Sequence, residues 1–390
     1  MKQLLTISGY LAVKEVWRNR GRFLLVSLVI ALITLLVLFI AALGEGLGNG
    51  NREYLAKLDA EMIVFQAKSD FLIQASRLGR DRLAAIRRVE GVADAGMFGT
   101  ASATVVLPGD VEPLKVALLG VEPGHAGEPP VTQGRQLSTD QAKEVIIDRN
   151  TALRSDLALG DLVNLRVTQG TQDEFFELRV VGISDGRQFA LQPSIFVPFQ
   201  TWERVRPKSE AEVNSSNAVA NVILVRLTNP EEIDLVTQRL TAQVKNIEIA
   251  TRQTAIEALP GYSAQQSTLN TQGGFTLFIG VLVIGGFFQI QILQKVAQIG
   301  VLKAIGTANP LVAASSVIQI VVVTVIGVAI GGLLAYLFSL TFPPTVPIVF
   351  NGTTSLFAVI ALLLIGPLGG LASIQYAVRI EPLKALGLSS

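Results

Sequence analysis

Cysteine is absent from the 390-residue sequence, and histidine occurs once, at His125. Without cysteine the chain forms no disulfide, offers no thiolate for catalysis and builds no cysteine-ligated zinc site. One histidine does not make a multi-histidine metal site, so we expect His125, in Pro-Gly-His-Ala-Gly, to be an ordinary loop residue. The sequence therefore predicts no bound metal and no directly bound cofactor.

Charged residues are also scarce in this sequence. Only 16% of residues are charged, whereas 50% are hydrophobic, and the net charge is +1. A basic stripe that would neutralise nucleic-acid phosphates is missing, which argues against nucleic acid as a partner. A chain of this length and apolarity is typical of a membrane protein rather than a soluble globule.

Two catalytic motifs are missing as well. No Gly-x-x-x-x-Gly-Lys-Ser/Thr sequence occurs, so the chain has no phosphate-binding loop and is not itself an ATPase. The nearest match to a nucleophile elbow, Gly-Tyr-Ser-Ala-Gln at residues 261–265, lacks the final glycine. We therefore expect a non-catalytic protein.

Four long apolar runs are present: residues 23–43, 273–293, 310–342 and 355–376. The first has 21 residues without a charge, about 31 Å of helix, which is enough to cross a bilayer. A cleaved signal peptide is the alternative for this run, although signal peptides usually have only ~7–15 apolar residues. None of the runs contains the ionisable side chains that ion-driven transporters normally need. The sequence predicts an α-helical membrane protein with four transmembrane helices and a large α+β domain, residues 44–272, inserted between the first two.

Basic residues are unevenly distributed over the short segments outside these runs. Residues 1–22 contain five, the segment 294–309 two and the tail 377–390 two, whereas the loop 343–354 has none. The positive-inside rule therefore places both termini in the cytoplasm and the inserted domain outside. Residues 1–22 are also predicted to form an amphipathic helix in the membrane interface. Its interfacial residues are Trp17, Arg18, Arg20 and Arg22.

The inserted domain has strand and helix patterns of the soluble type. We expect Gly44, Gly46 and Gly48 to end the first transmembrane helix or to form a flexible hinge. Two α/β flanks are predicted to pack together, with a β-rich middle lobe on top of them. In the second flank, Asn229 is predicted to cap a helix that begins at Pro230. The predicted strands are 61–65, 101–107, 114–121, 144–148, 162–168, 175–183, 221–227 and 247–250, the fifth and sixth pairing with each other; another helix is predicted at 80–89.

Two Gly-x-x-x-Gly pairs lie in the last two apolar runs, Gly327 with Gly331 and Gly366 with Gly370. This spacing lets helix backbones approach closely in lipid. Packing within one chain and contact between two copies both fit the pattern.

The segment 294–306 lies between the second and third apolar runs and contains two lysines and no acid. On a helix, Gly300 and Ala304 would form a bare patch that another surface approaches closely. The alternative is an ordinary loop helix that joins two spans. The apolar face is predicted to comprise Ile299, Val301, Leu302 and Ile305.

The sequence Ile-Gly-x-Leu-Lys-Ala-Ile-Gly at residues 299–306 resembles the coupling helix of the FtsX/MacB-like ABC transporter permeases, whose pattern is Arg-Glu-Ile-Gly-Ile-Leu-Arg-Ala-Leu-Gly. Gln298 stands where the family has Glu. The basic start resembles the family's elbow helix, the insert its periplasmic domain, and residues 379–386 its C-terminal Pro-x-x-Ala-Leu motif. The resemblance implies the following ATPase-coupling residues: Gln298, Ile299, Gly300, Leu302, Lys303, Ala304, Ile305 and Gly306.

The same resemblance implies a permease subunit of the bacterial inner membrane, driven by a separate cytoplasmic ATPase that uses ATP and Mg²⁺. It implies a dimer, either of two copies or with a paralogous permease. The other implied partners are membrane lipids and a periplasmic adaptor protein. The expected function is export or extraction of an amphiphilic or hydrophobic substrate, such as a drug, lipid or lipoprotein. Two alternatives stay open: an FtsX-like permease that activates a periplasmic cell-wall hydrolase, and a membrane-anchored sensor without an ATPase.

Overall fold

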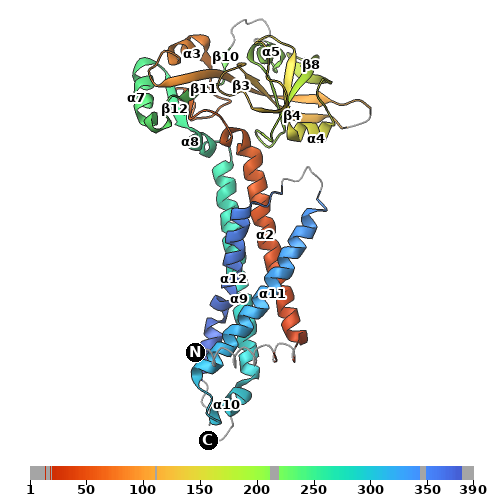
Figure 1. Ribbon diagram of the computed structural model, residues 1–390, viewed down its shortest axis with the longest axis vertical. Helices are drawn as coiled ribbons and strands as arrows, with labels where there is room; N and C mark the ends of the chain where they lie inside the picture. Colours follow the sequence, from red (N-terminus) through yellow and green to blue (C-terminus); the bar gives the residue numbers. More distant parts are fainter. Residues whose placement is uncertain are drawn as a thin grey trace. The chain divides into compact units, whose positions relative to one another are not determined.

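The computed structural model describes residues 14, 18, 20–109, 112–210, 219–342 and 348–379. The chain divides into two compact units (Figure 1). One, which we call the bundle, combines Met1–Gly46 with Gln266–Ser390, and the other, the sheet unit, is Leu47–Gln265. Trp17 and the C-terminal motif that follows Arg379 lie outside the described residues.

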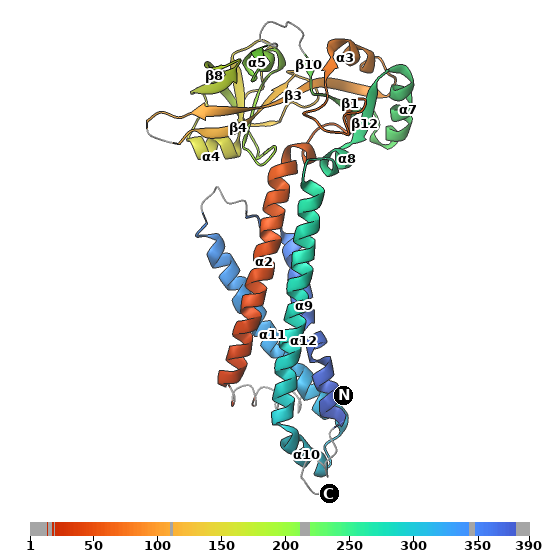
Figure 2. The same cartoon turned by 180° about the vertical axis from the view of Figure 1, so that it is seen from behind.

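Four helices in the described part of the chain are long and apolar enough to cross a membrane. They pack together in the bundle, where α11 crosses α2 at an angle (Figure 2), and a short helix, α10, connects the second to the third. Their apolar core includes Phe23, Ile30, Phe288 and Val323. The helices are α2 (Arg20–Ala56), α9 (Tyr262–Gln294), α10 (Val296–Ala304), α11 (Asn309–Ser339) and α12 (Gly352–Arg379).

Two of these helices extend well beyond the apolar runs that predicted them. The expectation that glycines 44–48 end the first helix is wrong, because α2 continues without a break to Ala56. Helix α9 likewise begins at Tyr262, eleven residues before the predicted span. Apolar composition marked only the parts suited to lipid, whereas the backbone hydrogen bonds of a helix continue through the polar residues beyond them.

The Gly-x-x-x-Gly pairs lie at crossings between helices of the same chain. A Cβ at Gly331 would lie 2.5 Å from the carbonyl oxygen of Ala31 on α2, so only glycine allows this approach. Gly370 similarly faces Ile320 on α11, where a Cβ would come within 2.3 Å of the side chain. Gly327 also faces α2, and Gly366 also faces α11. This placement favours packing within one chain.

The sheet unit contains one large sheet with strand order β12-β1-β11-β3-β4-β9-β6-β8-β5, in which β7 pairs with β3 and β8. Its strands are β1 (Met62–Gln66), β3 (Val92–Val106), β4 (Leu114–Val121), β5 (Val131–Gly134), β6 (Glu144–Asp148), β7 (Leu162–Gln169), β8 (Gln172–Ser184), β9 (Ser194–Pro198), β11 (Val222–Leu227) and β12 (Ile247–Thr251). A separate pair joins β2 (Leu78–Gly79) to β10 (Val219–Ala220). The short helices are α3 (Arg80–Ile86), α4 (Arg149–Ser155), α5 (Phe199–Val205), η1 (Pro230–Glu232), α7 (Ile233–Gln243) and α8 (Arg252–Glu257).

Strand β3 joins the flanks and the middle lobe into this single sheet. Its first half pairs with β11 of the flank, and its second half pairs with β4 and with β7 of the lobe. The predicted lobe on top of the flanks is therefore wrong, since a strand of 15 residues extends across both regions. Alternation of apolar residues predicted several of the strands but not their lateral order.

Several local predictions for the sheet unit are confirmed. Strands β7 and β8 pair as an antiparallel hairpin closed at Gly170, whose φ of 64° suits glycine. Asn229 accepts a hydrogen bond from the N–H of Glu231 at 3.2 Å, with Pro230 next to it. The helix begins as a 3₁₀ turn before continuing as α7.

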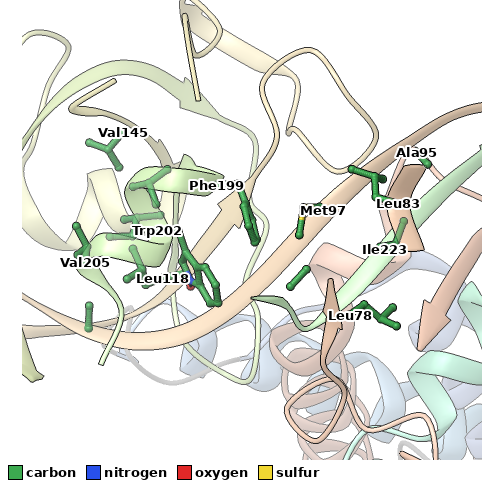
Figure 3. Packing of buried hydrophobic residues seen from close by; sticks show 14 of the residues in the cluster. Leu78, Leu83, Ala95, Met97, Leu118, Val145, Phe199, Trp202, Val205 and Ile223 are labelled. Carbon is green, nitrogen blue, oxygen red and sulfur yellow. The ribbon is translucent and has the colours of Figure 1, made fainter. Parts of the chain in front are cut away.

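Strand β9 and helix α5 were not predicted, yet they supply the centre of one apolar core (Figure 3). Trp202 lies across strands β3 and β4 and donates from Nε1 to the carbonyl oxygen of Leu118 at 3.2 Å. Gly99 and Gly120 are directly paired across these strands, and a Cβ at either would overlap the indole. The two glycines therefore form the slot that holds the ring.

Candidate functional site

Helix α10 forms the segment singled out by its sequence. It begins one residue after α9 ends, and it terminates in a Schellman motif. The N–H of Gly306 donates to the Lys303 carbonyl at 3.0 Å, and that of Thr307 donates to the Leu302 carbonyl at 3.0 Å. Gly306 has φ of 102°, which disfavours any residue with a side chain. The glycine therefore ends α10 sharply and allows the chain to turn back into α11.

One side of α10 is packed against the bundle. Ile299 is buried in a cluster with Ile292, Val312 and Ala377, which come from α9, α11 and α12. The ammonium group of Lys303 donates to the carbonyl oxygen of Val378 at 2.6 Å, near the end of α12. These contacts hold α10 as a fixed part of the bundle.

The opposite side of α10 is exposed and largely apolar. Ile305 is 80% exposed, Leu302 45% and Val301 43%. Gln298 and Ala304 are also exposed. We call the set of Gln298, Val301, Leu302, Ala304 and Ile305 the coupling face. Large apolar residues on a surface that the chain itself leaves uncovered are typical of a contact with another molecule.

Two predictions about this segment are wrong. Gly300 is buried, so it does not form an open patch with Ala304. Ile299 likewise points into the bundle rather than sharing a face with Ile305. At 100° per residue, Ile299 lies about 160° from Val301 and about 120° from Ile305 around a helix, so the predicted shared face does not fit helix geometry. The sequence also did not reveal which side of the helix the neighbouring helices cover.

A cavity of about 120 Å³ adjoins α10, lined both by the buried Ile299 and by Gln298 and Leu302 of the coupling face. Its lining is mostly apolar, but it includes the amides of Gln291 and Gln319, which are both almost fully buried, and the hydroxyl groups of Ser315 and Ser316. The hydroxyl groups of Ser315 and Ser316 already donate to the carbonyl oxygen of Val312, at 2.9 and 3.1 Å.

The basic start of α2 lies against the end of α9. Arg22 donates to the side-chain oxygen of Gln294 at 2.8 Å, and the ammonium group of Lys295 lies 5.7 Å from the centre of the Phe23 ring. Arg18 and Arg20 are exposed. The positively charged residues of the α2 start and of α10 therefore occupy the same end of the bundle, as the sequence predicted for one membrane side.

The far end of α2 is anchored in the sheet unit through Tyr54. This residue is fully buried, stacks on Phe98 with ring centres 5.1 Å apart, and donates to the Gly127 carbonyl at 3.0 Å. Burial raises the pKa of the Tyr54 hydroxyl far above its ordinary value, so the group remains a donor. Tyr54 thus fixes the end of a membrane helix inside the core of the sheet.

A loop before β9 clamps the same end of α2. The buried Arg187 of this loop binds Asp185 at 2.7 Å and the carbonyl of Lys57 at 2.8 Å. Its backbone N–H donates to Asp148 at 3.3 Å. Burial raises the pKa of Asp148, although hydrogen bonds from Thr151 and Asn150 favour its ionised form. We call Lys57, Asp148, Asp185 and Arg187 the α2 clamp.

His125 lies in a turn, as expected for a loop residue. Its Nδ1 lies 2.8 Å from Asp94, which also accepts from the N–H of Ala126 at 2.8 Å and from Arg226 at 3.0 Å. Partial burial alone would raise the pKa of Asp94, but the hydrogen bonds from His125 and from the backbone N–H of Ala126 hold this pKa below its usual range. Within the residues that the structure describes, no three metal-binding side chains come together.

Comparison with known proteins assigns the chain to a family. Residues 23–243 match the MacB-like periplasmic core domain, and residues 271–382 match the FtsX-like permease C-terminal domain. The chain belongs to the FtsX/MacB-like ABC transporter permeases. It is therefore a multi-pass membrane protein and the permease component of an ABC transporter, a class that works with an ATPase partner.

Relatives in this permease family align over nearly their whole length. HrtB of Staphylococcus haemolyticus, named as a hemin transport system permease, is 24% identical over 377 residues, which cover 97% of this chain and 99% of that protein. An uncharacterized ABC transporter permease of Mycobacterium bovis is 24% identical over 391 residues, with the same coverage. The solved periplasmic region of MacB from Actinobacillus actinomycetemcomitans is 14% identical, with a TM-score of 0.35, over 51% of this chain and 91% of that structure.

Proposed function

We propose that a separate cytoplasmic ATPase docks on the coupling face of α10. ATP hydrolysis by this ATPase then moves the bundle and, through α2, the sheet unit. The observation that carries this proposal is the exposed apolar side chain of Ile305 on a helix whose other side is packed against three membrane helices. A helix fixed in this way transmits a push to the helices that hold it. ATP and Mg²⁺ belong to the ATPase, and the permease contributes no catalytic group.

Helix α2 is the proposed path from the bundle to the sheet unit. Support comes from its unbroken course from Arg20 to Ala56, from the burial of Tyr54 and from the hydrogen bonds of the α2 clamp at its end. A continuous helix anchored at both ends moves both attachments when it tilts. The hinge proposed at Gly44, Gly46 and Gly48 then becomes a place where α2 bends, rather than a place where the helix ends.

We propose an orientation with both termini in the cytoplasm and the sheet unit outside the cell membrane. The basic residues at the α2 start and on α10 support this assignment. The absence of native cysteine makes the test direct, because one engineered cysteine is the only thiol in the chain. An exposed cysteine at Asp173 should react with an impermeant maleimide in intact cells or spheroplasts, whereas one at Ile305 should react only after the membrane is opened.

The proposed substrate is an amphiphilic or hydrophobic molecule that the dimer exports or extracts from the membrane. Hemin, which names the staphylococcal relatives, belongs to this chemical class and is one substrate to test. The dimer forms from two copies or with a paralogous permease, and a periplasmic adaptor is a further proposed partner. Measuring the mass of the complex purified from its native membrane distinguishes these compositions.

The docking proposal is tested by co-purification of the ATPase with full-length protein. Burying an isoleucine side chain contributes about 1.5–3 kcal/mol, so Ile305→Asp should lower the amount of bound ATPase by about tenfold or more. Leu153→Asp is the matched control, because Leu153 is 75% exposed but lies in the sheet unit. Equal ATPase recovery with Ile305→Asp and wild type, at equal membrane insertion, would contradict the docking site.

Gly300→Trp is a poor test of docking because Gly300 is buried. An indole there would displace the bundle's own helices, and loss of the ATPase would then report misfolding. A substitution at the exposed Ile305 distinguishes loss of ATPase docking from misfolding of the permease.

A further inference from the structure

The bundle contains a second hollow, between α2 and α11, at the end where the chain leads toward the sheet unit. It has a volume of about 290 Å³. Its walls include Leu36 and Phe39 from α2 and Ala335 and Phe338 from α11, and Phe350 closes one end. We call this hollow the acyl chamber.

The geometry of the crossing helices explains why a hollow forms here. Gly331 brings α11 close to α2 at Ala31, and beyond this crossing the two helices separate (Figures 1 and 2). Phe39 and Phe342 partly fill the widening gap, with ring centres 5.9 Å apart. The gap is thus a wedge whose narrow end is set by glycine and whose wide end is bordered by aromatic rings.

The segment before α12 closes the wide end of the wedge. The N–H of Val349 donates to the Ala42 carbonyl at 3.1 Å, and Asn351 donates to Glu45 at 3.1 Å. Thr354 also donates to Glu45, at 3.4 Å. These bonds hold Phe350 in place and form a polar rim, Glu45, Asn351 and Thr354, about 9 Å along α2 from Phe39.

Among the residues that the structure describes, the chamber lining is hydrocarbon apart from one hydroxyl group. Ser339 supplies this hydroxyl, which already donates to the Tyr336 carbonyl at 2.6 Å. A charged group inside the chamber would lose its hydration without gaining a partner, which is strongly unfavourable. A flexible hydrocarbon chain has no favourable hydration to lose, and it gains van der Waals contact with the chamber walls.

The chamber is open on the side that faces away from the bundle. Leu32, Leu36 and Phe338 border it and are each about half exposed, at 54%, 48% and 52%. In a membrane-spanning bundle this side faces lipid tails. A ligand therefore enters laterally from the bilayer, with its polar part toward the rim.

We propose that the acyl chamber binds one acyl chain of a membrane phospholipid, with the head group beside the polar rim. The inference deepens the proposed function, on which it rests, by naming a lipid as the substrate class. A planar macrocycle such as hemin fits less well, because the described lining residues include no histidine, cysteine or methionine to bind iron and no cation for its carboxylates.

The test uses full-length protein in nanodiscs that contain phosphatidylethanolamine with a diazirine in one acyl chain. After illumination, peptide mass spectrometry should find adducts concentrated at Phe39, Phe338 and Phe342. Ala335→Phe fills the chamber and should reduce these adducts at least fivefold. Leu333→Phe, on the same helix but 59% exposed, adds a ring outside the chamber and should leave them unchanged. If Ala335→Phe does not accumulate, Leu36→Trp narrows the chamber from the opposite wall.

Two results would overturn the acyl-chain assignment. One is labelling spread evenly over lipid-facing positions such as Leu28 and Phe278 and insensitive to Ala335→Phe, which indicates only surrounding lipid. The other is hemin binding, followed by its Soret absorbance, that Ala335→Phe abolishes and that displaces the lipid label. Co-purification of the ATPase is measured in parallel, because Ala335→Phe should leave it intact. Failure of the chamber is thereby distinguished from failure of docking at α10.

Discussion

The bundle and the sheet unit are stabilised by contacts of different kinds. In the bundle, helices meet where a side chain is missing, as at Gly331 against Ala31. In the sheet unit, large buried rings and ion pairs fix the strands, as Tyr54 does on Phe98 and Arg226 on Asp94. The bundle should therefore be more sensitive to added atoms and the sheet unit to removed ones. The sheet unit combines a missing side chain with a large buried ring at one position, where Gly99 and Gly120 make room for Trp202.

The largest effect is expected from removing Tyr54. Tyr54→Ala leaves a cavity beside Phe98 and an unpaired Gly127 carbonyl, which should destabilise the sheet unit by about 3–5 kcal/mol. Urea-induced exposure to a protease measures this change in the full-length protein. Val301→Ala, on the exposed coupling face, serves as the control and should leave the midpoint unchanged. If the urea midpoint of Tyr54→Ala equalled that of wild type, the sheet unit would not be sensitive to removed atoms in the way proposed.

The next effect tests added atoms in the bundle. Gly331→Leu places a side chain where the α2 backbone lies, and overpacking of this kind costs about 1–3 kcal/mol. Gly332→Leu is a close control, since no atom lies within 4 Å of a Cβ at this position. Thermal aggregation in detergent should begin at lower temperature for Gly331→Leu only. Equal behaviour of the two variants would contradict the helix crossing.

A smaller, pH-dependent effect is expected from Asp94 in the sheet unit. Its pKa is held below the usual range, so the unfolded chain binds more protons in acid. The stability that Asp94 contributes is present above its unfolded pKa of about 3.9 and is lost as the pH falls through the lower folded value. Because solvent still partly screens this partly buried carboxylate, we expect no more than about 1 kcal/mol. Asp94→Asn should narrow the difference between the urea midpoints at pH 7 and pH 3. An unchanged difference would show that Asp94 does not contribute to the loss of stability in acid.

The smallest effect concerns Gln298 on the coupling face. Gln298→Glu restores the acid found in the family pattern, and an exposed ion pair with the ATPase would add about 0.2–1 kcal/mol. Co-purification should rise up to about fivefold at low salt and return to the wild-type level at high salt, because salt screens exposed charges. An increase that persists at high salt would argue against an ion pair.

The sequence was most informative where one periodic signal decided the structure. Strands β4 and β6 match their predicted bounds, and uncharged runs located all four membrane helices. Prediction failed where burial depends on packing against another part of the chain, since nothing in residues 299–306 tells which side of α10 the bundle covers. The slot for Trp202 is another case, because Gly99 and Gly120 become partners only through pairing of β3 with β4. The α2 clamp unites residues more than 100 positions apart, so no local pattern marks it.

Site-specific cross-linking tests the central claim about α10 most directly. The chain has no native cysteine, so a single cysteine at Ile305 or at Ile299 can carry a photoactivatable cross-linker without background. In native membranes, the exposed Ile305→Cys should form a cross-link to a P-loop ATPase, whereas the buried Ile299→Cys should not. Absence of any ATPase cross-link from Ile305→Cys, in membranes where the ATPase is present and active, would contradict docking on the coupling face.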